Sequence, residues 1–371
     1  MHYVKLLLGM AAICVAALLI MSGITGGLLA FYDEIDAFLN PGFYHVETGG
    51  EMLPPPALIE KLEQARPEVA VWYLQYPKNP GETAMLTAEP KPDAAGGYPP
   101  IASNTFYLDP HSGEIVGEKY WGRCCFEPQN VLNYLYEMHH SLTDGAWGAY
   151  LMGGVAGVLL INCLLVLFGA IGVTPATDTL FLIPIKHKAV ALVFALLLLP
   201  IALSSIAMNL ADEVFKPLVS VFSPVKASVY EEYSKKELRD FGQRKLSYDD
   251  AYQLAQQLGR ENGNPGPVAE LFYSSSYNFY GMGYGYRDPD GLGNDWIYLD
   301  GADGHVVGAR TPGRGTAGDQ LFSLQLPIHS GRLAGLTTKI LVALLGLLIA
   351  ALSGRYIVIA SRQLFRPKQA A

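Results

Sequence analysis

The histidines are the residues of this chain whose type and spacing suggest chemistry. His139 and His140 stand side by side just before a long apolar run, His329 precedes another such run, and His187 opens a third. Neutral imidazole is a good iron ligand, and histidines at matched depths on facing helices of a bundle are what the axial pair of a haem requires. One alternative is that they are ordinary amphipathic residues at a membrane surface. Another is zinc, which needs three or four close ligands, but the chain has no Cys-x-x-Cys or His-Glu-x-x-His.

Long apolar runs show what kind of protein holds these histidines. Half of the 371 residues are hydrophobic and 16% are charged, and the mean hydropathy is +0.21. Spanning a bilayer takes about 20 apolar residues, and four runs are long enough: 4–31, 147–172, 187–210 and 337–360. The sequence therefore predicts an integral membrane protein. The first run is too long for a signal-peptide core and no small-x-small cleavage site follows it, so we expect an uncleaved span.

Basic residues predict the orientation of the spans. They flank the start of the first span, the loop between the second and third, and the tail: Lys5, Lys186, Lys188, Arg355, Arg362, Arg366 and Lys368. By the positive-inside rule these short segments lie in the cytoplasm, together with both chain ends. The long segments 32–146 and 211–336, which carry nearly all of the acidic excess, then lie outside. This topology suits a bacterial inner membrane with both large segments in the periplasm.

An internal repeat predicts the architecture. "YLDPHSGEIVG" (107–117) and "YLDGADGHVVG" (298–308) match without a gap, and each has the pattern of a strand, a tight turn and a strand. A helical stretch precedes each module, at 56–68 and at 247–259, and Ser247 is a plausible N-cap of the second. Each half would be span, small α+β domain, span, with the repeat axis along the membrane normal.

The expected fold class is therefore a membrane α-helical protein, a four-helix transmembrane bundle with two small α+β extracytoplasmic domains in tandem repeat. The expected parts are helix 1 (1–31), the first periplasmic domain (32–146), helix 2 (147–172), a cytoplasmic loop (173–186), helix 3 (187–210), the second periplasmic domain (211–336), helix 4 (337–360) and a cytoplasmic tail (361–371).

The combined motifs resemble those of a known family. "SGITGGLLAFYDEIDAFLNP", the doubled YLD modules, "MHHSLTDGAWG", "FKPLVSVFSP" and "PIHSGRLAGL" are similar to PepSY-associated transmembrane proteins over nearly the whole chain, with the nearest resemblance to inner-membrane siderophore reductases of the FoxB type. The resemblance implies two PepSY-like periplasmic domains, bound haem b and reduction of ferric siderophores, which releases iron as Fe(II).

The resemblance also implies haem ligands, position by position. "MHHS" places His139 on the family histidine before the second span, with His140 as the alternative, and "PIHSG" gives His329 as its partner. "IKHKAV" gives His187 for a second, inner haem. The family histidine of the first span falls on Leu8, so His2 or Met10 would have to complete that inner pair. The outer haem is thus better supported than the inner one.

Other features complete the functional hypothesis. The composition of the Tyr-rich segment 273–291 predicts a hairpin. A second interpretation of the same segment is a surface on which a siderophore docks. No dinucleotide fingerprint occurs, so the electron donor would be a quinol or a cytoplasmic reductant, and nothing indicates nucleic-acid binding. Cys124 and Cys125 are adjacent, and the sequence leaves open whether they are free thiols or form a disulfide. The rival hypotheses are a haem-free binding or regulatory membrane protein and a transporter subunit.

Overall fold

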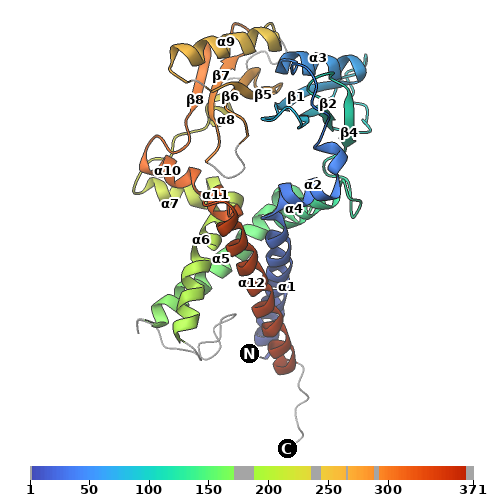
Figure 1. Cartoon of the computed structure of the whole chain (residues 1–371). Coiled ribbons are helices and arrows are strands. Elements are labelled where there is room, and N and C mark those ends of the chain that lie inside the picture. The colour runs from blue at the N-terminus through green and yellow to red at the C-terminus, as the bar shows by residue number, and fades with distance from the viewer. Residues whose placement is uncertain (1, 171–187, 235–243, 265, 288–291, 365–371) are drawn as a thin grey trace, which may run out of the picture. The chain divides into compact units, whose positions relative to one another are not determined.

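The chain folds into two compact units. The computed structural model describes residues 2–170, 188–234, 244–264, 266–287 and 292–364 (Figure 1). The membrane unit comprises Met1–Tyr32, Tyr134–Pro224 and Leu321–Ala371, and the sheet unit comprises Asp33–Asn133 and Val225–Gln320. Each is described separately below.

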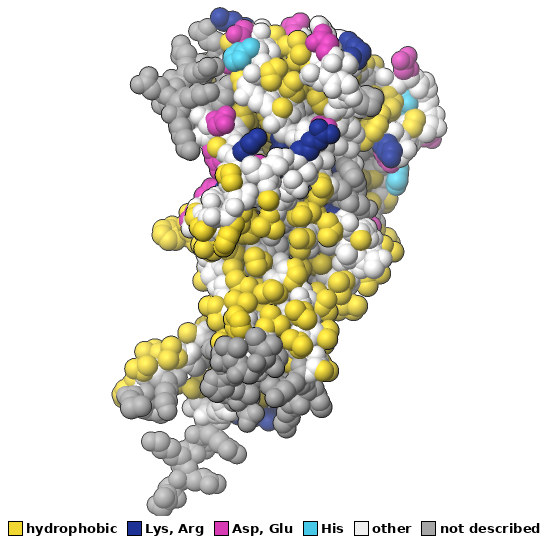
Figure 2. Space-filling view, turned by 90° about the vertical axis from the view of Figure 1, so that its left-hand side faces the viewer, with side chains coloured by type: hydrophobic (Ala, Val, Ile, Leu, Met, Phe, Trp, Pro, Cys, Tyr) yellow, Lys and Arg dark blue, Asp and Glu magenta, His cyan; other side chains and the backbone are white. Residues whose placement is uncertain are grey.

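Four long apolar helices dominate the membrane unit: α1 (His2–Leu29), α5 (Gly145–Ala170), α6 (Lys188–Asn209) and α12 (Leu336–Leu364). All four contain stretches long and apolar enough to cross a bilayer, namely Leu6–Leu29, Gly145–Gly169, Ala189–Asn209 and Leu336–Leu364. Figure 2 shows hydrophobic side chains gathered over them. Each of the four predicted spans thus has an apolar helix at its place in the chain, and the chain is a membrane protein. Helix α12 continues past the predicted end of its span at residue 360 to Leu364, and its last turn carries the basic Arg362.

The four spans share one apolar core. Leu19 of α1, Leu159 of α5, Leu198 of α6 and Ile349 of α12 belong to a single cluster of buried side chains. Since lipid is as apolar as these side chains, close packing and not exclusion from water holds such helices together. The four-helix bundle expected from the sequence is therefore present in this unit.

Glycines set the closest helix contact of the bundle, between α1 and α12. A Cβ atom placed on Gly23 would lie 2.3 Å from the carbonyl oxygen of Gly346, and one on Gly346 would lie 2.3 Å from that of Gly23. Gly27, four residues after Gly23, faces Ala343 at 3.4 Å. This is the small-xxx-small pattern that lets two membrane helices approach at backbone distance.

Shorter helices of the membrane unit flank the spans. They are α4 (Val131–Ser141), which crosses the boundary between the units, the π-type turn Ala211–Phe215, α7 (Lys216–Ser220) and α11 (Gln325–Ser330). Helix α10 (Ala317–Ser323) also crosses that boundary. Of these helices, α4 and α11 carry the histidines discussed below.

The sheet unit is built on one antiparallel sheet. Its strands are β1 (Val69–Gln75), β2 (Ala84–Pro90), β3 (Thr105–Leu108), β4 (Ile115–Lys119), β5 (Val268–Ser274), β6 (Phe279–Tyr284), β7 (Asp295–Asp300) and β8 (Val306–Arg310). The strand order is β4-β3-β2-β1-β5-β6-β7-β8. The two segments that the sequence assigns to separate domains therefore contribute four strands each to this sheet. They join where β1 pairs with β5, with Leu74 opposite Leu271.

Two helices cover one face of this sheet, α3 (Pro55–Ala65) and α9 (Tyr248–Glu261). Leu58 of α3 and Ala255 of α9 lie in one buried cluster with strand residues such as Leu74 and Leu271. The predicted N-cap is confirmed: Ser247 Oγ accepts the Asp250 N–H, and the Asp250 carboxylate accepts the Ser247 N–H, which forms a capping box. Both predicted helices and both predicted strand–turn–strand modules are thus present. The segment 273–291 covers the end of β5, the turn to β6 and β6 itself, while residues 288–291 lie outside the described residues.

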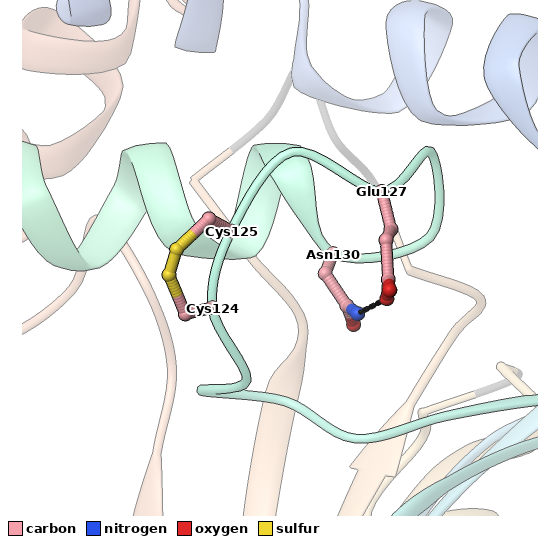
Figure 3. The surroundings of a disulfide bond; sticks show 4 residues. All are labelled: Cys124, Cys125, Glu127 and Asn130. Carbon is pink, nitrogen blue, oxygen red and sulfur yellow. Dashed lines mark hydrogen bonds between the residues drawn. A yellow bond between two sulfur atoms is a disulfide. The ribbon is translucent and has the colours of Figure 1, made fainter.

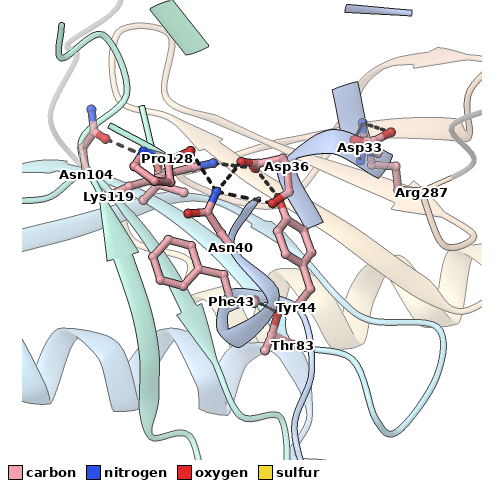
Figure 4. Close-up of polar contacts among 11 residues, drawn as sticks. Asp33, Asp36, Asn40, Phe43, Tyr44, Thr83, Asn104, Lys119, Pro128 and Arg287 are labelled. Carbon is pink, nitrogen blue, oxygen red and sulfur yellow. Dashed lines mark hydrogen bonds and ion pairs between the residues drawn. The ribbon is translucent and has the colours of Figure 1, made fainter. Parts of the chain in front are cut away.

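Helix α2 (Tyr32–Leu39) is held in the sheet unit by one buried and one partly exposed ion pair, both of which the sequence analysis missed. Asp36, at the centre of Figure 4, accepts hydrogen bonds from Lys119 Nζ at 2.8 Å, from Asn40 Nδ2 at 2.8 Å and from the Tyr44 hydroxyl. Asp33 pairs with Arg287 at 3.1 Å. The first contact is with β4 and the second with the segment after β6, so α2 binds both halves of the sheet. The remaining helices of this unit are the 3₁₀ turn Pro41–Phe43 and α8 (Val229–Ser234).

The adjacent cysteines lie in the connection between β4 and α4. Cys124 and Cys125 are joined by a disulfide, and nearby Asn130 Nδ2 donates to Glu127 at 2.9 Å (Figure 3). We assign this disulfide no part in the candidate functional site.

We predict that Gly23→Ala destabilises the membrane unit. The added Cβ meets backbone atoms that cannot rotate away, and forced overpacking costs about 1–3 kcal/mol. Thermal unfolding of the detergent-solubilised protein should show a lower midpoint than the wild type. Gly154→Ala is the matched control, because an added Cβ there meets nothing within 4 Å. Equal midpoints for the two variants would contradict the inferred α1–α12 contact.

Candidate functional site

A pair of histidine rings forms the centre of the candidate site. The ring centroids of His139 on α4 and His329 on α11 lie 5.8 Å apart, with 49° between the ring planes. Both residues belong to the membrane unit and both are partly buried. The structure therefore brings together the two histidines that the sequence predicts as the outer pair.

Glycines position both short helices against the spans that follow them. A Cβ atom on Gly148 of α5 would lie 1.6 Å from the Ser141 carbonyl oxygen, so only glycine lets the end of α4 rest on α5. Gly331 ends α11 with a φ of 73°, and a Cβ atom there would lie 2.8 Å from the Thr338 carbonyl oxygen of α12. Each histidine is thus carried by a helix that is packed closely onto the next span.

Hydroxyl groups on the other two spans hold the rings through Nδ1. His139 Nδ1 lies 2.9 Å from Thr25 Oγ1 of α1. His329 Nδ1 lies 3.2 Å from Ser204 Oγ and 3.4 Å from Ser205 Oγ, both of α6. Every span therefore takes part: α1 and α6 supply hydroxyls, and α5 and α12 support the helices that carry the rings.

The hydroxyl protons decide the tautomer of each ring. Thr25 Oγ1 donates to the Met21 carbonyl oxygen at 2.8 Å, and Ser204 and Ser205 both donate to the Ile201 carbonyl oxygen, at 2.9 and 2.8 Å. A hydroxyl that gives its one proton to a carbonyl accepts from the imidazole. With the hydroxyl protons on these carbonyls, Nδ1 carries the hydrogen in both rings, and Nε2 has the free lone pair.

Burial keeps both rings neutral at physiological pH. Removal from water, together with the neighbouring His329 and His140, lowers the pKa of His139 to about 3. Burial lowers the pKa of His329 to about 4. A metal ion binds the neutral form of imidazole, so both rings are in the state that ligation requires.

The geometry of the pair fits two ligands of one metal. Their ring centroids are 5.8 Å apart, so both imidazoles would be near enough to bind the same metal ion. Among the described residues, the one group of three or more close metal-binding side chains is Asp300, Asp303 and His305, in the β7–β8 turn of the sheet unit. Within the described part of the chain, no third metal-binding side chain joins the His139–His329 pair in such a group. A two-ligand set suits an iron porphyrin, whose ring nitrogens supply the other four ligands, better than it suits zinc.

The family of the chain follows from its sequence as a whole. The family model of the PepSY-associated TM region matches residues 9–357. The chain belongs to the PepSY-associated transmembrane family. A comparison with curated proteins gave no match.

The remaining predicted ligands of this PepSY-associated protein have different outcomes. The His140 ring stacks on Tyr136, with centroids 5.9 Å apart and 4° between the planes, so His139 is the member of the vicinal pair that faces His329. His187 lies outside the described residues. His2 begins α1, and its side chain is not among those described. Met10 is exposed on α1, whereas its neighbour Gly9 faces Leu364 of α12. The inner pair stays a prediction.

The sequence analysis missed the anchoring hydroxyls. Thr25, Ser204 and Ser205 were not among its predicted site residues. A weak signal was present, because "SGIT" (22–25) and "IALSS" (201–205) occupy similar places near the ends of α1 and α6. A hydroxyl on a membrane helix usually bonds its own backbone, so nothing in the sequence shows that it also binds a distant ring.

We predict that acidification destabilises the protein prepared without haem. Because the folded pKa values lie below the unfolded value of about 6.5, these rings contribute full stability above that pH and lose it as the pH falls towards 4. Between pH 7 and pH 5 the loss should reach about 2 kcal/mol per ring. Thermal unfolding at both pH values measures it. The His139→Gln/His329→Gln variant should show a smaller pH dependence, and an unchanged dependence would contradict the assignment.

Proposed function

We propose that this protein is a haem-containing reductase of the bacterial inner membrane, which passes electrons across the membrane to ferric siderophores in the periplasm and releases iron as Fe(II). The observation that carries the proposal is the His139–His329 pair, whose Nε2 atoms are free to bind a metal because hydroxyls hold both Nδ1 atoms. Haem would supply one-electron chemistry at this place.

The protein residues have a limited and specific part in this function. His139 and His329 would bind the haem iron, while Thr25, Ser204 and Ser205 would orient the two imidazoles and keep the hydrogen on Nδ1. The apolar spans exclude water, and burial and hydrogen bonds to ligands are two of the means by which a protein sets a haem potential. Reduction weakens the hold of a siderophore because its hard oxygen ligands bind ferrous ion less tightly than ferric ion.

The proposed direction of electron flow, from the cytoplasmic side or the membrane to the periplasm, rests on the topology that the basic residues predict. Their positions favour cytoplasmic chain ends and a periplasmic sheet unit. The donor would be a quinol or a cytoplasmic reductant, and a second haem bound by His187 with His2 or Met10 would shorten the step across a bilayer of about 30 Å. The siderophore as acceptor rests on the resemblance to siderophore reductases.

We predict that the purified protein shows a Soret band that shifts when dithionite is added. His139→Ala and His329→Ala should each lose the outer haem, measured as haem per chain. His140→Ala should retain it, because that ring stacks on Tyr136. Exposed His305 provides a second control. Colourless wild-type protein from haem-replete cells would exclude the reductase and favour a haem-free binding protein. The acceptor is tested separately, since a ferric siderophore should reoxidise the reduced protein and the iron-free siderophore should not.

We also predict that Thr25→Val changes the properties of the haem without removing His139. Valine keeps the shape of threonine but cannot accept the Nδ1 hydrogen, so the imidazole becomes a poorer electron donor to iron. Haem affinity should fall about 10–100-fold, and the midpoint potential should become more positive. Ser22→Ala is the matched control, because that hydroxyl donates to Leu18 on the same helix. Identical potentials in Thr25→Val and the wild type would show that this hydroxyl is only structural.

At the other ring, two hydroxyls share one imidazole, so Ser204→Ala alone should have a smaller effect than the Ser204→Ala/Ser205→Ala double variant. The same potential measurement tests this difference.

A further inference from the structure

The chain turns sharply where span α6 ends. Leu210 leaves the helical conformation, with φ −132° and ψ 44°, and the π-type turn Ala211–Phe215 and helix α7 follow. We name residues 211–222 the α7 segment. Pro217, Asp212 and Glu213 within it are poor residues for a continuing membrane span. The segment is therefore a separate structure at the end of the span, and it lies within the membrane unit.

One side of the α7 segment is fixed to the protein. The buried Phe215 ring packs against the Phe322 ring, with centroids 6.0 Å apart. Lys216 Nζ lies 5.2 Å from the centroid of the same Phe322 ring and pairs with Asp212 at 2.7 Å. These contacts determine which side chains point away from the protein.

The opposite side exposes large apolar side chains. Leu218 is 62% exposed, Val221 76% and Phe222 92%. Contiguous exposed apolar side chains on a folded protein indicate an interaction surface. Phe222 is held at this place by backbone bonds, since its N–H donates to the Val219 carbonyl oxygen at 2.9 Å.

A hydrogen bond joins the α7 segment to the start of span α5. The Tyr150 hydroxyl of α5 donates to Glu213 Oε1 at 3.1 Å. Trp147, one turn earlier on α5, is 78% exposed, and its ring centroid lies 6.1 Å from that of Tyr150. Exposed Trp and Tyr at the end of a span mark the level of the lipid headgroups. The α7 segment is therefore at the depth where apolar side chains meet the edge of the hydrocarbon.

We propose that the α7 segment is an interfacial membrane anchor, with Leu218, Val221 and Phe222 inserted at the boundary between the headgroups and the acyl chains. The surface is continuous with the spans, which already lie in lipid. Its attraction is hydrophobic, because residues 210–224 contain Asp212 and Glu213 but only one basic residue, Lys216, and Lys216 is paired with Asp212. Interfacial helices that bind anionic lipids are instead rich in Lys and Arg.

Tryptophan fluorescence in vesicles tests this proposal on the full chain. Phe222→Trp is reconstituted in phosphatidylcholine vesicles with and without brominated acyl chains, and its emission is compared with that of the wild type. The expected result is added emission at short wavelength that brominated lipid quenches and aqueous iodide does not. Adding anionic phosphatidylglycerol should leave the quenching unchanged.

Tyr98→Trp is the matched control, because Tyr98 is similarly exposed but lies in the sheet unit. Its added emission should be quenched by iodide and not by brominated lipid. Quenching of Phe222→Trp by iodide would overturn the proposal in favour of a water-exposed surface. Protection from both quenchers would overturn it in favour of a protein partner or a second copy of the chain.

Discussion

The functional part of this protein depends on one constraint: an imidazole buried among apolar helices must have a partner for its hydrogen. An unpaired polar group in such a place costs free energy comparable to a lost hydrogen bond. Thr25 satisfies His139, and Ser204 with Ser205 satisfies His329, in each case through Nδ1. With their own protons on helix carbonyls, these hydroxyls accept from Nδ1, which gives both rings the tautomer that leaves Nε2 free. The chemistry available at the site is thus decided by groups that would touch no metal.

Meeting this constraint requires accurate positioning of four helices, and small residues provide it. Thr25 lies two residues from Gly23, where α1 and α12 approach at backbone distance. Gly26 lies beside the imidazole itself, since a Cβ atom on it would be 2.8 Å from His139 Cε1. Gly148 and Gly331 bring the histidine helices onto α5 and α12. The same residue type therefore serves helix packing and ligand placement, and a side chain at any of these positions would move a ring.

The sequence predicted the parts of this arrangement that depend on local pattern. Apolar runs locate spans because each span is longer than any ordinary buried helix, and Ser247 was recognised because a capping box lies within four residues. The His139–His329 pair was found through the family resemblance combined with the position of each histidine before a span. The hydroxyl anchors, the Gly23–Gly346 contact and the β1–β5 pairing were missed because each joins residues far apart in the chain. The buried Asp36–Lys119 pair was missed for the same reason, since neither residue has a neighbour in sequence that indicates its partner.

The two halves of the chain differ at the exit of their first spans, although both exits begin with an acidic pair. After α1, Asp33 binds Arg287 and Asp36 binds Lys119, so α2 is fixed to the sheet. After α6, Asp212 binds Lys216 within its own helix turn, and Glu213 accepts from Tyr150 of a span. Carboxylates thus hold α2, after the first span, to the sheet. In the α7 segment, after α6, they bond within the membrane unit, and the apolar side of that segment stays exposed. Such a difference lets one exit hold the sheet while the other, as we propose, contacts lipid.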